Sequence, residues 1–448
     1  MIRKFINTEK GQTSVLLALA FIGLLGFTAL AVDGGMVYAN RRHMQNAADA
    51  ASLAGGSAAA LYLENHYVIY RDWSCSDLRV IRAMSNSTNG AEIIAVNSAL
   101  TNDYSLDYDI SDKHGVDAKC VQGASNGSWI ERYIDVKTYI TADTPTAFAH
   151  FVYSGPLRNT VEAVARVFPR VPLAYGNAIV ALAKDCDLGG IEFDGSNVVS
   201  VTGGGIFSNS CIDTRGGVSV NVYGTSDDNI SCVLPDCYDD HGSTGVVSPA
   251  PIENTGVPLP PETYHVPPPD CTVLPYRGNY NGDGKIEYGR YDTIRIQNGD
   301  HKFDPGLFCV TGDVEINGGI VAGSDVTFYV VNGDFHTSGN ATSSIIAPPA
   351  NNCGPPCDTF FAMPGVLVYL SPGNTNEVTL LGTEDSVFRG LVYAPSGTIQ
   401  AGGTSSLMRE IYTQLIGNDV KVHGNTNVVV TFNDKLVYQI PARLELNK

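Results

Sequence analysis

One uninterrupted apolar stretch near the start of the chain predicts the first element. Residues 15–32 contain no charged side chain. A helix of about 18 residues is roughly 27 Å long, which is enough to cross the hydrocarbon core of a bilayer. The pattern therefore predicts a membrane-spanning helix over residues 14–33. Its apolar side chains include Val15, Leu16, Leu19, Phe21, Leu24, Leu25, Phe27 and Leu30.

The charges around this stretch predict its orientation. Arg3, Lys4 and Lys10 precede the apolar residues, and Asp33 follows them. Positive charges beside a membrane helix favour the cytoplasmic side. We therefore expect residues 1–13 to be cytoplasmic, and the bulk of the chain to be extracytoplasmic or at the cell surface.

A cleaved signal peptide is the alternative interpretation, because Ala29 and Ala31 form an A-x-A pattern. The apolar stretch is longer than the usual signal-peptide core of about 7–15 residues. Alanine-rich, helix-favouring sequence also continues through residues 34–65. These features favour an uncut anchor that continues outward as one helix. The small side chains of residues 34–65 allow packing on neighbouring subunits or on the chain's own domain.

Beyond the helix, the pattern of apolar residues changes twice. Residues 66–170 mix a helix-like segment with alternating strands, which predicts a small α+β module. Residues 171–448 contain short β-branched runs ended by Gly, Asn or Asp. This spacing predicts stacked strands in a parallel β-helix-like solenoid, and a β-sandwich is the alternative. The proline-rich residues 248–270 predict an extended linker, or a strap along the outside of the solenoid.

Composition narrows the function classes. The chain has 448 residues, 17% charged residues and a formal net charge of -18. Nucleic-acid binding needs a basic face, so we expect no nucleic-acid partner. An acidic excess fits an exported protein that must stay soluble.

The ten cysteines all follow the apolar segment, which favours an oxidising compartment and disulfides. We expect Cys75 with Cys120 and Cys186 with Cys211 to pair within their own domains, and Cys353 with Cys357 to close a local loop. Sequence leaves the remaining connectivity open. The disulfide candidates are Cys75, Cys120, Cys186, Cys211, Cys232, Cys237, Cys271, Cys309, Cys353 and Cys357.

Two segments carry candidate chemistry. Residues 279–290 resemble an EF-hand or dockerin calcium loop, with oxygen ligands at Asn279, Asn281 and Asp283, but Arg290 stands where a bidentate Glu is expected. The sequence thus predicts no obligatory cofactor, with calcium as an alternative to a simple turn.

The second segment is an acidic cluster formed by Asp185, Asp187, Glu192 and Asp194. Paired carboxylates on one face of a β-helix would suit a carbohydrate-active enzyme. Solvated surface charge explains the same cluster, and the chain shows no metalloprotease, nucleophile-elbow or nucleotide-binding motif. We therefore expect no catalytic residues and no enzyme activity.

The N-terminal block resembles a known family. It contains Gly11 and Gln12 before the apolar run, Asp33 and Gly34 after it, then Arg41, Arg42, Gln45, Asn46, Ala47, Asp49 and Ala50. This block resembles the TadE/TadG-like proteins of Tad (Flp) pilus assembly, over about the first third of the chain. The resemblance implies a membrane-anchored, pseudopilin-like or accessory protein of an adhesive pilus system.

Two departures from the family limit what the resemblance implies. Type IV prepilins carry a Glu five residues after their cleavage point, where this chain would have Leu16 if cleavage followed Gly11. Asp109, Ser111 and Asp112 match the metal motif of some TadG-like proteins only in part. Neither pilin processing nor that metal site is therefore carried over.

Three functions remain open on sequence alone. The first is a structural or adhesive component of a Tad-type pilus or surface adhesion apparatus, with membrane and other pilus or secretion-apparatus subunits as partners. The second is an anchored β-helix carbohydrate-active enzyme. The third is a module that binds surface polysaccharide. The specific N-terminal block favours the first.

Overall fold

A computed structural model of the chain divides it into two compact units. Unit 1 comprises Met1–Gln122, Arg132–Pro169 and Ala442–Lys448, and unit 2 comprises Gly123–Glu131 and Arg170–Pro441. The structure describes residues 12–87, 89–123, 131–148, 157–225, 227–282, 284–338, 340–350, 361–383, 385–403, 409–424 and 427–447.

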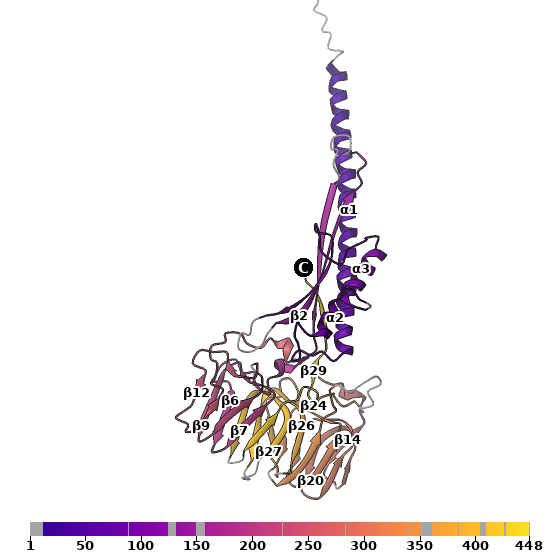
Figure 1. The fold of residues 1–448 in the computed structure, drawn as a ribbon. Coiled ribbons are helices and arrows are strands. Elements are labelled where there is room, and N and C mark those ends of the chain that lie inside the picture. Colours follow the sequence, from indigo (N-terminus) through magenta and orange to yellow (C-terminus); the bar gives the residue numbers. More distant parts are fainter. Residues whose placement is uncertain are drawn as a thin grey trace, which may run out of the picture. The chain divides into compact units, whose positions relative to one another are not determined.

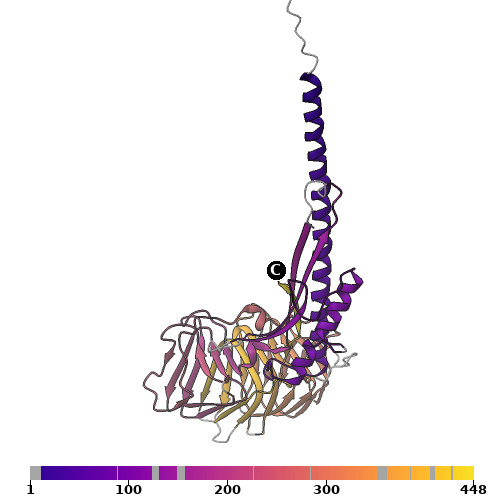
Figure 2. The ribbon, with the colours of Figure 1, turned by 45° about the horizontal axis from the view of Figure 1, so that its top comes forward.

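Unit 1 is built on one long helix, α1 (Gln12–Asn65) (Figure 1). Its first part is apolar enough to span a membrane: the most apolar window has a mean hydropathy of 2.6 and none of it is buried. Leu24 is 65% exposed and Phe27 is 78% exposed. In Figures 1 and 2 this part of α1 extends beyond the strands of unit 1. The protein therefore has an N-terminal apolar helix that suggests a membrane anchor.

The second part of α1 packs on its own unit. A stripe with helical spacing is fully buried, made of Met44, Ala47, Ala48, Ala51, Ala59 and Leu63. Small side chains let the helix approach the sheet closely, and Gly55 brings its backbone to the carbonyl of Ala91. The alanine-rich sequence allowed packing on neighbouring subunits or on the chain's own domain. In the structure this part of α1 packs on the chain's own domain.

A four-stranded antiparallel sheet in the order β1-β2-β3-β30 supports α1. Tertiary packing also involves two short helices. The elements are α2 (Leu78–Met84), α3 (Ala91–Thr101), β1 (Gly115–Gln122), β2 (Arg132–Thr144), β3 (Leu157–Phe168) and β30 (Arg443–Asn447). Alternation of buried and exposed residues in β3 follows from one face packing on α1.

The last strand corrects the domain boundary expected from sequence. The sequence predicts one β-rich domain over residues 171–448, but β30 belongs to unit 1 because it pairs with β3, with Phe168 opposite Arg443. Unit 2 is therefore inserted between two neighbouring strands of unit 1. Its own ends are tied together by the antiparallel pair β4 (Val171–Pro172) and β29 (Gln439–Ile440).

Unit 2 is mostly β-structure, in a parallel sheet that joins 24 strands of the described residues. Its neighbouring strands pair in parallel, whereas a β-sandwich is built from antiparallel pairs. The β-sandwich alternative is therefore wrong. The strands are β5 (Ile179–Ala181), β6 (Gly190–Gly195), β7 (Val198–Thr202), β8 (Ile206–Ser208), β9 (Cys211–Gly216), β10 (Ser219–Tyr223), β11 (Ile230–Cys232), β12 (Tyr238–Asp239), β13 (Val247–Ser248), β14 (Tyr276–Tyr280), β15 (Gly284–Ile286), β16 (Gly289–Ile296), β17 (Asp300–Phe303), β18 (Gly306–Val310), β19 (Val314–Ile316), β20 (Gly319–Ser324), β21 (Val326–Val330), β22 (Phe335–Thr337), β23 (Ala341–Ile346), β24 (Val366–Leu370), β25 (Glu377–Leu380), β26 (Val387–Gly403), β27 (Arg409–Gly424) and β28 (Val428–Thr431).

The strands are not stacked in chain order. The chain begins the sheet at β5 and β6, which pair with β27 on one side and with β8 and β9 on the other. It proceeds to one end of the stack at β11–β13, then restarts at the opposite end with β14 and returns to β27. Figure 1 shows this order, with β12 and β14 at opposite ends and β27 between them.

The segment between β13 and β14 must therefore run from one end of the stack to the other. Three of its apolar side chains are almost fully buried: Leu259 is 2% exposed, Val266 0% and Leu274 3%, whereas Ile252, Val257 and Val273 are exposed. The three buried side chains pack on Tyr329, Tyr369 and other residues of the sheet's outer side. Short 3-10 turns form at η4 (Pro261–Thr263) and η5 (Cys271–Val273). We call residues 249–275 the strap; it contains the predicted proline-rich segment except Ser248, which is the last residue of β13.

Three tyrosines form a ladder beneath the strap. Tyr329 is paired with Tyr369, and Tyr369 with Tyr393, on successive strands. The Tyr369 hydroxyl donates a 2.7 Å hydrogen bond to the carbonyl of Val266. Burial raises the pKa of Tyr369 and of Tyr393 above the ordinary value of 10, and raises the pKa of Tyr291 to about 12.

These pKa shifts predict alkaline sensitivity of unit 2. The folded state holds the phenolic protons more tightly than the unfolded chain does, so this stabilisation is complete below pH 10 and is lost as the pH rises through the folded-state pKa values. We expect the free energy of unfolding to fall between pH 10 and pH 12. Chemical denaturation at a series of pH values measures it.

The variants Tyr369→Phe and Tyr393→Phe separate the tyrosines from other alkaline effects. Each removes one titrating hydroxyl, so the slope of stability against pH should become shallower. Tyr369→Phe should also lose about 1 kcal/mol at neutral pH, because the Val266 carbonyl loses its donor. Slopes equal to that of the parent protein would contradict the assignment.

Candidate functional site

A row of polar side chains crosses one outer face of unit 2. Its members occupy the same register position on nine consecutive strands and alternate with buried apolar neighbours such as Ile191 and Phe193. The row, which we call the polar column, consists of Arg295, Glu315, His336, Thr379, Gln400, Lys421, Glu192, Asp213 and Asp239. Of these residues, only Glu192 belongs to the acidic cluster predicted from sequence.

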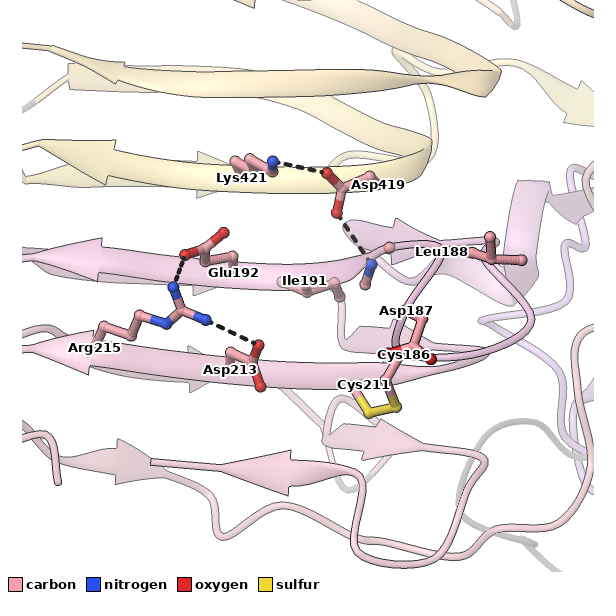
Figure 3. A pocket seen from close by; sticks show the side chains of 12 residues that line it. Cys186, Asp187, Leu188, Ile191, Glu192, Cys211, Asp213, Arg215, Asp419 and Lys421 are labelled. Atoms are coloured by element: carbon pink, nitrogen blue, oxygen red, sulfur yellow. Dashed lines mark hydrogen bonds and ion pairs between the residues drawn. A yellow bond between two sulfur atoms is a disulfide. The ribbon is translucent and has the colours of Figure 1, made fainter. Parts of the chain in front are cut away.

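Charge is concentrated where the column crosses β6 and β9. The Arg215 guanidinium lies 3.0 Å from the Glu192 carboxylate and 3.7 Å from the Asp213 carboxylate. Figure 3 shows Arg215 reaching both acids from β9. His241 lies 3.5 Å from Asp213 and 3.4 Å from Asp239. These carboxylates therefore have cationic or ionisable neighbours.

An open pocket of about 380 Å³ lies beside this group. Its wall includes the Cys186–Cys211 disulfide and, on the neighbouring strand, Asp419 and Lys421, which are 3.3 Å apart. Asp419 also accepts a 3.0 Å hydrogen bond from the backbone N–H of Gly190 (Figure 3). The pocket is thus lined by ion pairs and backbone rather than by an apolar surface.

The acidic cluster expected from sequence is only partly assembled. Glu192 lies on β6 and Asp187 on the pocket wall, whereas Asp185 accepts a hydrogen bond from the Leu188 N–H in the preceding turn. The carboxylate nearest Glu192 in register is Asp213. Glycoside hydrolysis needs two carboxyl groups facing one glycosidic bond, with space between them. Here the guanidinium of Arg215 reaches both acids, which favours a structural ion-pair network.

The calcium-like segment is divided between a strand and a turn. Asn279 belongs to β14, and its side-chain oxygen accepts a 2.8 Å hydrogen bond from the Thr293 hydroxyl. Asn281 follows the strand, and Asp283 lies outside the described residues. Among described residues no group of three His, Cys, Asp or Glu side chains is arranged to hold a metal. Calcium at Asn279 and Asn281 stays a prediction.

Four disulfides join cysteines of the described residues. Cys75–Cys120 in unit 1 and Cys186–Cys211 in unit 2 are the two pairs expected from sequence. The other two are Cys232–Cys237 and Cys271–Cys309. Cys271–Cys309 fastens the end of the strap to β18. Cys353 and Cys357 lie outside the described residues.

The N-terminal motif residues have two distinct environments along α1. Ala47 is buried, and Gln45 donates to Asp49 at 2.8 Å and to the Glu162 carbonyl on β3 at 3.1 Å. Gly34, Arg41, Arg42 and Asn46 are exposed, and Ala50 is half-buried. Gly11 lies outside the described residues, and Gln12 is the first residue of α1.

Asp33 is the exception at the end of the apolar stretch. Its side chain is only 4% exposed although its neighbours in sequence are exposed. Its carboxylate accepts hydrogen bonds from the backbone N–H of Ala147 at 2.6 Å and of Phe148 at 3.1 Å. This motif residue therefore attaches the segment after β2 to the helix.

Comparison with known proteins supports the resemblance in the N-terminal block. No curated protein matches the chain. A structure of the competence-associated pilin ComZ from Thermus thermophilus aligns over 90% of this chain and 98% of that chain, with 9% identity and a TM-score of 0.28, a score too low to support an argument about fold. The model of the family "Putative Flp pilus-assembly TadE/G-like" matches residues 11–60. Residues 11–60, which include the apolar part of α1 and most of its buried alanine stripe, are therefore similar to the Tad domain of the TadE/G-like type.

Proposed function

We propose that this protein is a membrane-anchored, extracytoplasmic component of a Tad-type pilus or surface adhesion apparatus, with a structural or adhesive and non-catalytic role. The observation that carries the proposal is the division of α1. An exposed apolar half is followed directly by a half that packs on an antiparallel sheet, and the match to the family covers both halves.

In this proposal each unit has a separate task. Unit 1 holds the anchor and unit 2, a parallel β-helix inserted into it, is presented outside the cell. Arg3, Lys4 and Lys10 keep the N-terminus cytoplasmic. The disulfides of both units form in the oxidising compartment and limit unfolding there. Polysaccharide binding by unit 2 stays a prediction.

The state of the N-terminus tests this proposal. We expect the native chain to fractionate with membranes and to retain residues 1–33, because α1 continues without a break from the apolar half into the packed half. Mass spectrometry of the intact protein measures this. A soluble product cut after Ala31 would contradict the anchor, whereas a cut after Gly11 would indicate prepilin-type processing and leave the anchor in place.

Association with other membrane helices is tested by photo-crosslinking. A photoreactive residue at Gly26, where a Cβ meets no atom of the described residues within 4 Å, should form adducts with neighbouring membrane subunits. Ala48 provides the matched control, because it is fully buried against unit 1 and should give no intermolecular adduct. A chain that stays uncrosslinked at Gly26 in native membranes would argue for a solitary anchor.

A further inference from the structure

The end of the apolar helix stretch is also the first point at which α1 is attached to the rest of unit 1. Val32 is 41% exposed and the next residue, Asp33, is 4% exposed. The Asp33 carboxylate holds the backbone of Ala147 and Phe148 at this height on the helix. If residues 15–32 cross a bilayer, the segment at 145–148 lies at the membrane surface.

The side chains at this height have the chemistry of a membrane interface. Tyr38 is 70% exposed and Phe148 is 39% exposed, and aromatic rings concentrate at the headgroup level of membranes. Arg41 and Arg42 are also exposed and have no ion-pair partner among the described residues. Guanidinium groups bind phosphate oxygens in pairs of hydrogen bonds.

The distances along α1 agree with this placement. Arg41 lies nine positions after Val32, which is about 14 Å along a helix axis. Side chains on a helix tilt toward its N-terminus, here toward the bilayer, and long arginine side chains extend to reach the interface. The headgroup layer adds about 5–8 Å on each side of the hydrocarbon core, so the guanidinium groups can reach it.

We propose that Tyr38, Arg41, Arg42 and Phe148 form a membrane rim that seats unit 1 on the bilayer and binds anionic phospholipid headgroups through the two arginines. The inference rests on the proposed anchor, since it takes residues 15–32 to be inserted. It also accounts for the presence of two basic residues after the apolar stretch, where the preference of positive charge for the cytoplasmic flank otherwise disfavours them. The rim fixes the height of unit 1 above the membrane.

Photo-crosslinking of the full chain tests the placement. The chain is reconstituted in phosphatidylcholine vesicles that contain phosphatidylglycerol, with a photoreactive residue at Leu24, Phe148 or Leu61. We expect lipid adducts at Leu24 and Phe148, and none at Leu61, which is 62% exposed but lies far along α1. Adducts at Leu24 without adducts at Phe148 would overturn the rim, and a lack of adducts at Leu24 would overturn the anchor itself.

Replacement of the arginines tests the chemistry. Arg41→Gln combined with Arg42→Gln should lower the enrichment of phosphatidylglycerol over phosphatidylcholine among co-purified lipids by roughly thirtyfold, since each of the two basic residues near an anionic surface contributes about 1 kcal/mol. Arg82→Gln, at an exposed arginine in α2, is the control and should leave the enrichment unchanged. Unchanged enrichment in the double variant, or crosslinks from Phe148 to another protein instead of lipid, would overturn the proposal.

Discussion

Phe328→Ala should lower the free energy of unfolding of unit 2 by about 3–5 kcal/mol, the usual range for removing a buried phenylalanine side chain. Phe328 is fully buried. Its ring centroid lies 4.9 Å from that of Phe303, 5.4 Å from that of Phe308 and 5.2 Å from that of Phe335. The four rings lie on four strands, β17, β18, β21 and β22, so the cavity left by alanine is bounded by parallel strands that cannot collapse independently.

Calorimetry of the full chain provides the measurement for Phe328→Ala. The transition of unit 2 should move to a lower temperature. Ile320→Ala is the matched control, since Ile320 lies on the preceding strand β20 but is 57% exposed, and it should change stability by less than about 0.5 kcal/mol. Similar shifts for the two variants would show that the aromatic cluster is not a continuous core.

Gly55→Val should destabilise unit 1 by about 3 kcal/mol, at the upper end of overpacking costs. A Cβ at Gly55 would lie 2.7 Å from the carbonyl oxygen of Ala91 and 2.9 Å from the Cβ of Ala95. The backbone oxygen cannot rotate away, so α3 must move off α1. Gly55 lies inside the segment that matches the family. We therefore expect the variant also to lower the amount of the protein recovered in the membrane fraction of cells.

Gly34→Ala is the control for Gly55→Val, because a Cβ at Gly34 meets no described atom within 4 Å. In that exposed helical position alanine is favoured over glycine by about 1 kcal/mol, so stability should stay the same or rise. Protease resistance of unit 1 in detergent measures both variants. A Gly55→Val protein as resistant as the parent would mean that the close approach of α1 and α3 is not needed.

The long apolar helix could be predicted because its signal is local. Residues 15–32 are apolar without interruption, and the helix continues because no Pro separates them from the alanine-rich stretch. The pairs Cys75–Cys120 and Cys186–Cys211 could also be predicted, since each joins cysteines of one predicted domain. The sequence did not determine which face of the alanine-rich stretch would be buried, because both partners need the same small side chains.

The polar column was missed because its members become neighbours only through the number of residues that separates one paired strand from the next. Glu192 and Asp213 are paired at 21 positions apart, as are Gln400 and Lys421. Elsewhere the spacing changes: His336 and Thr379 are paired across 43 positions, because a longer stretch of chain connects their two strands. The regular spacing around Glu192 was a usable signal for Asp213 and Arg215, whereas no spacing predicts that β6 would pair with β27.

The position of β30 was beyond prediction for a related reason. Its alternating residues 443–447 are too few to mark a strand of a separate sheet. Their partner β3 precedes the whole inserted unit in the sequence. Only the hydrogen-bonded register of Phe168 with Arg443 reveals the return.

That return links biosynthesis to assembly. A nascent chain that has made α1, the first three strands of the unit 1 sheet and most of unit 2 still exposes the open edge of β3, because its neighbour is encoded after the insertion. Chains that stop early, or whose inserted unit fails to bring its two ends together, would leave that strand edge unpaired and open to proteases. Completion of the four-stranded sheet of unit 1 thus reports that the inserted unit has been made and folded.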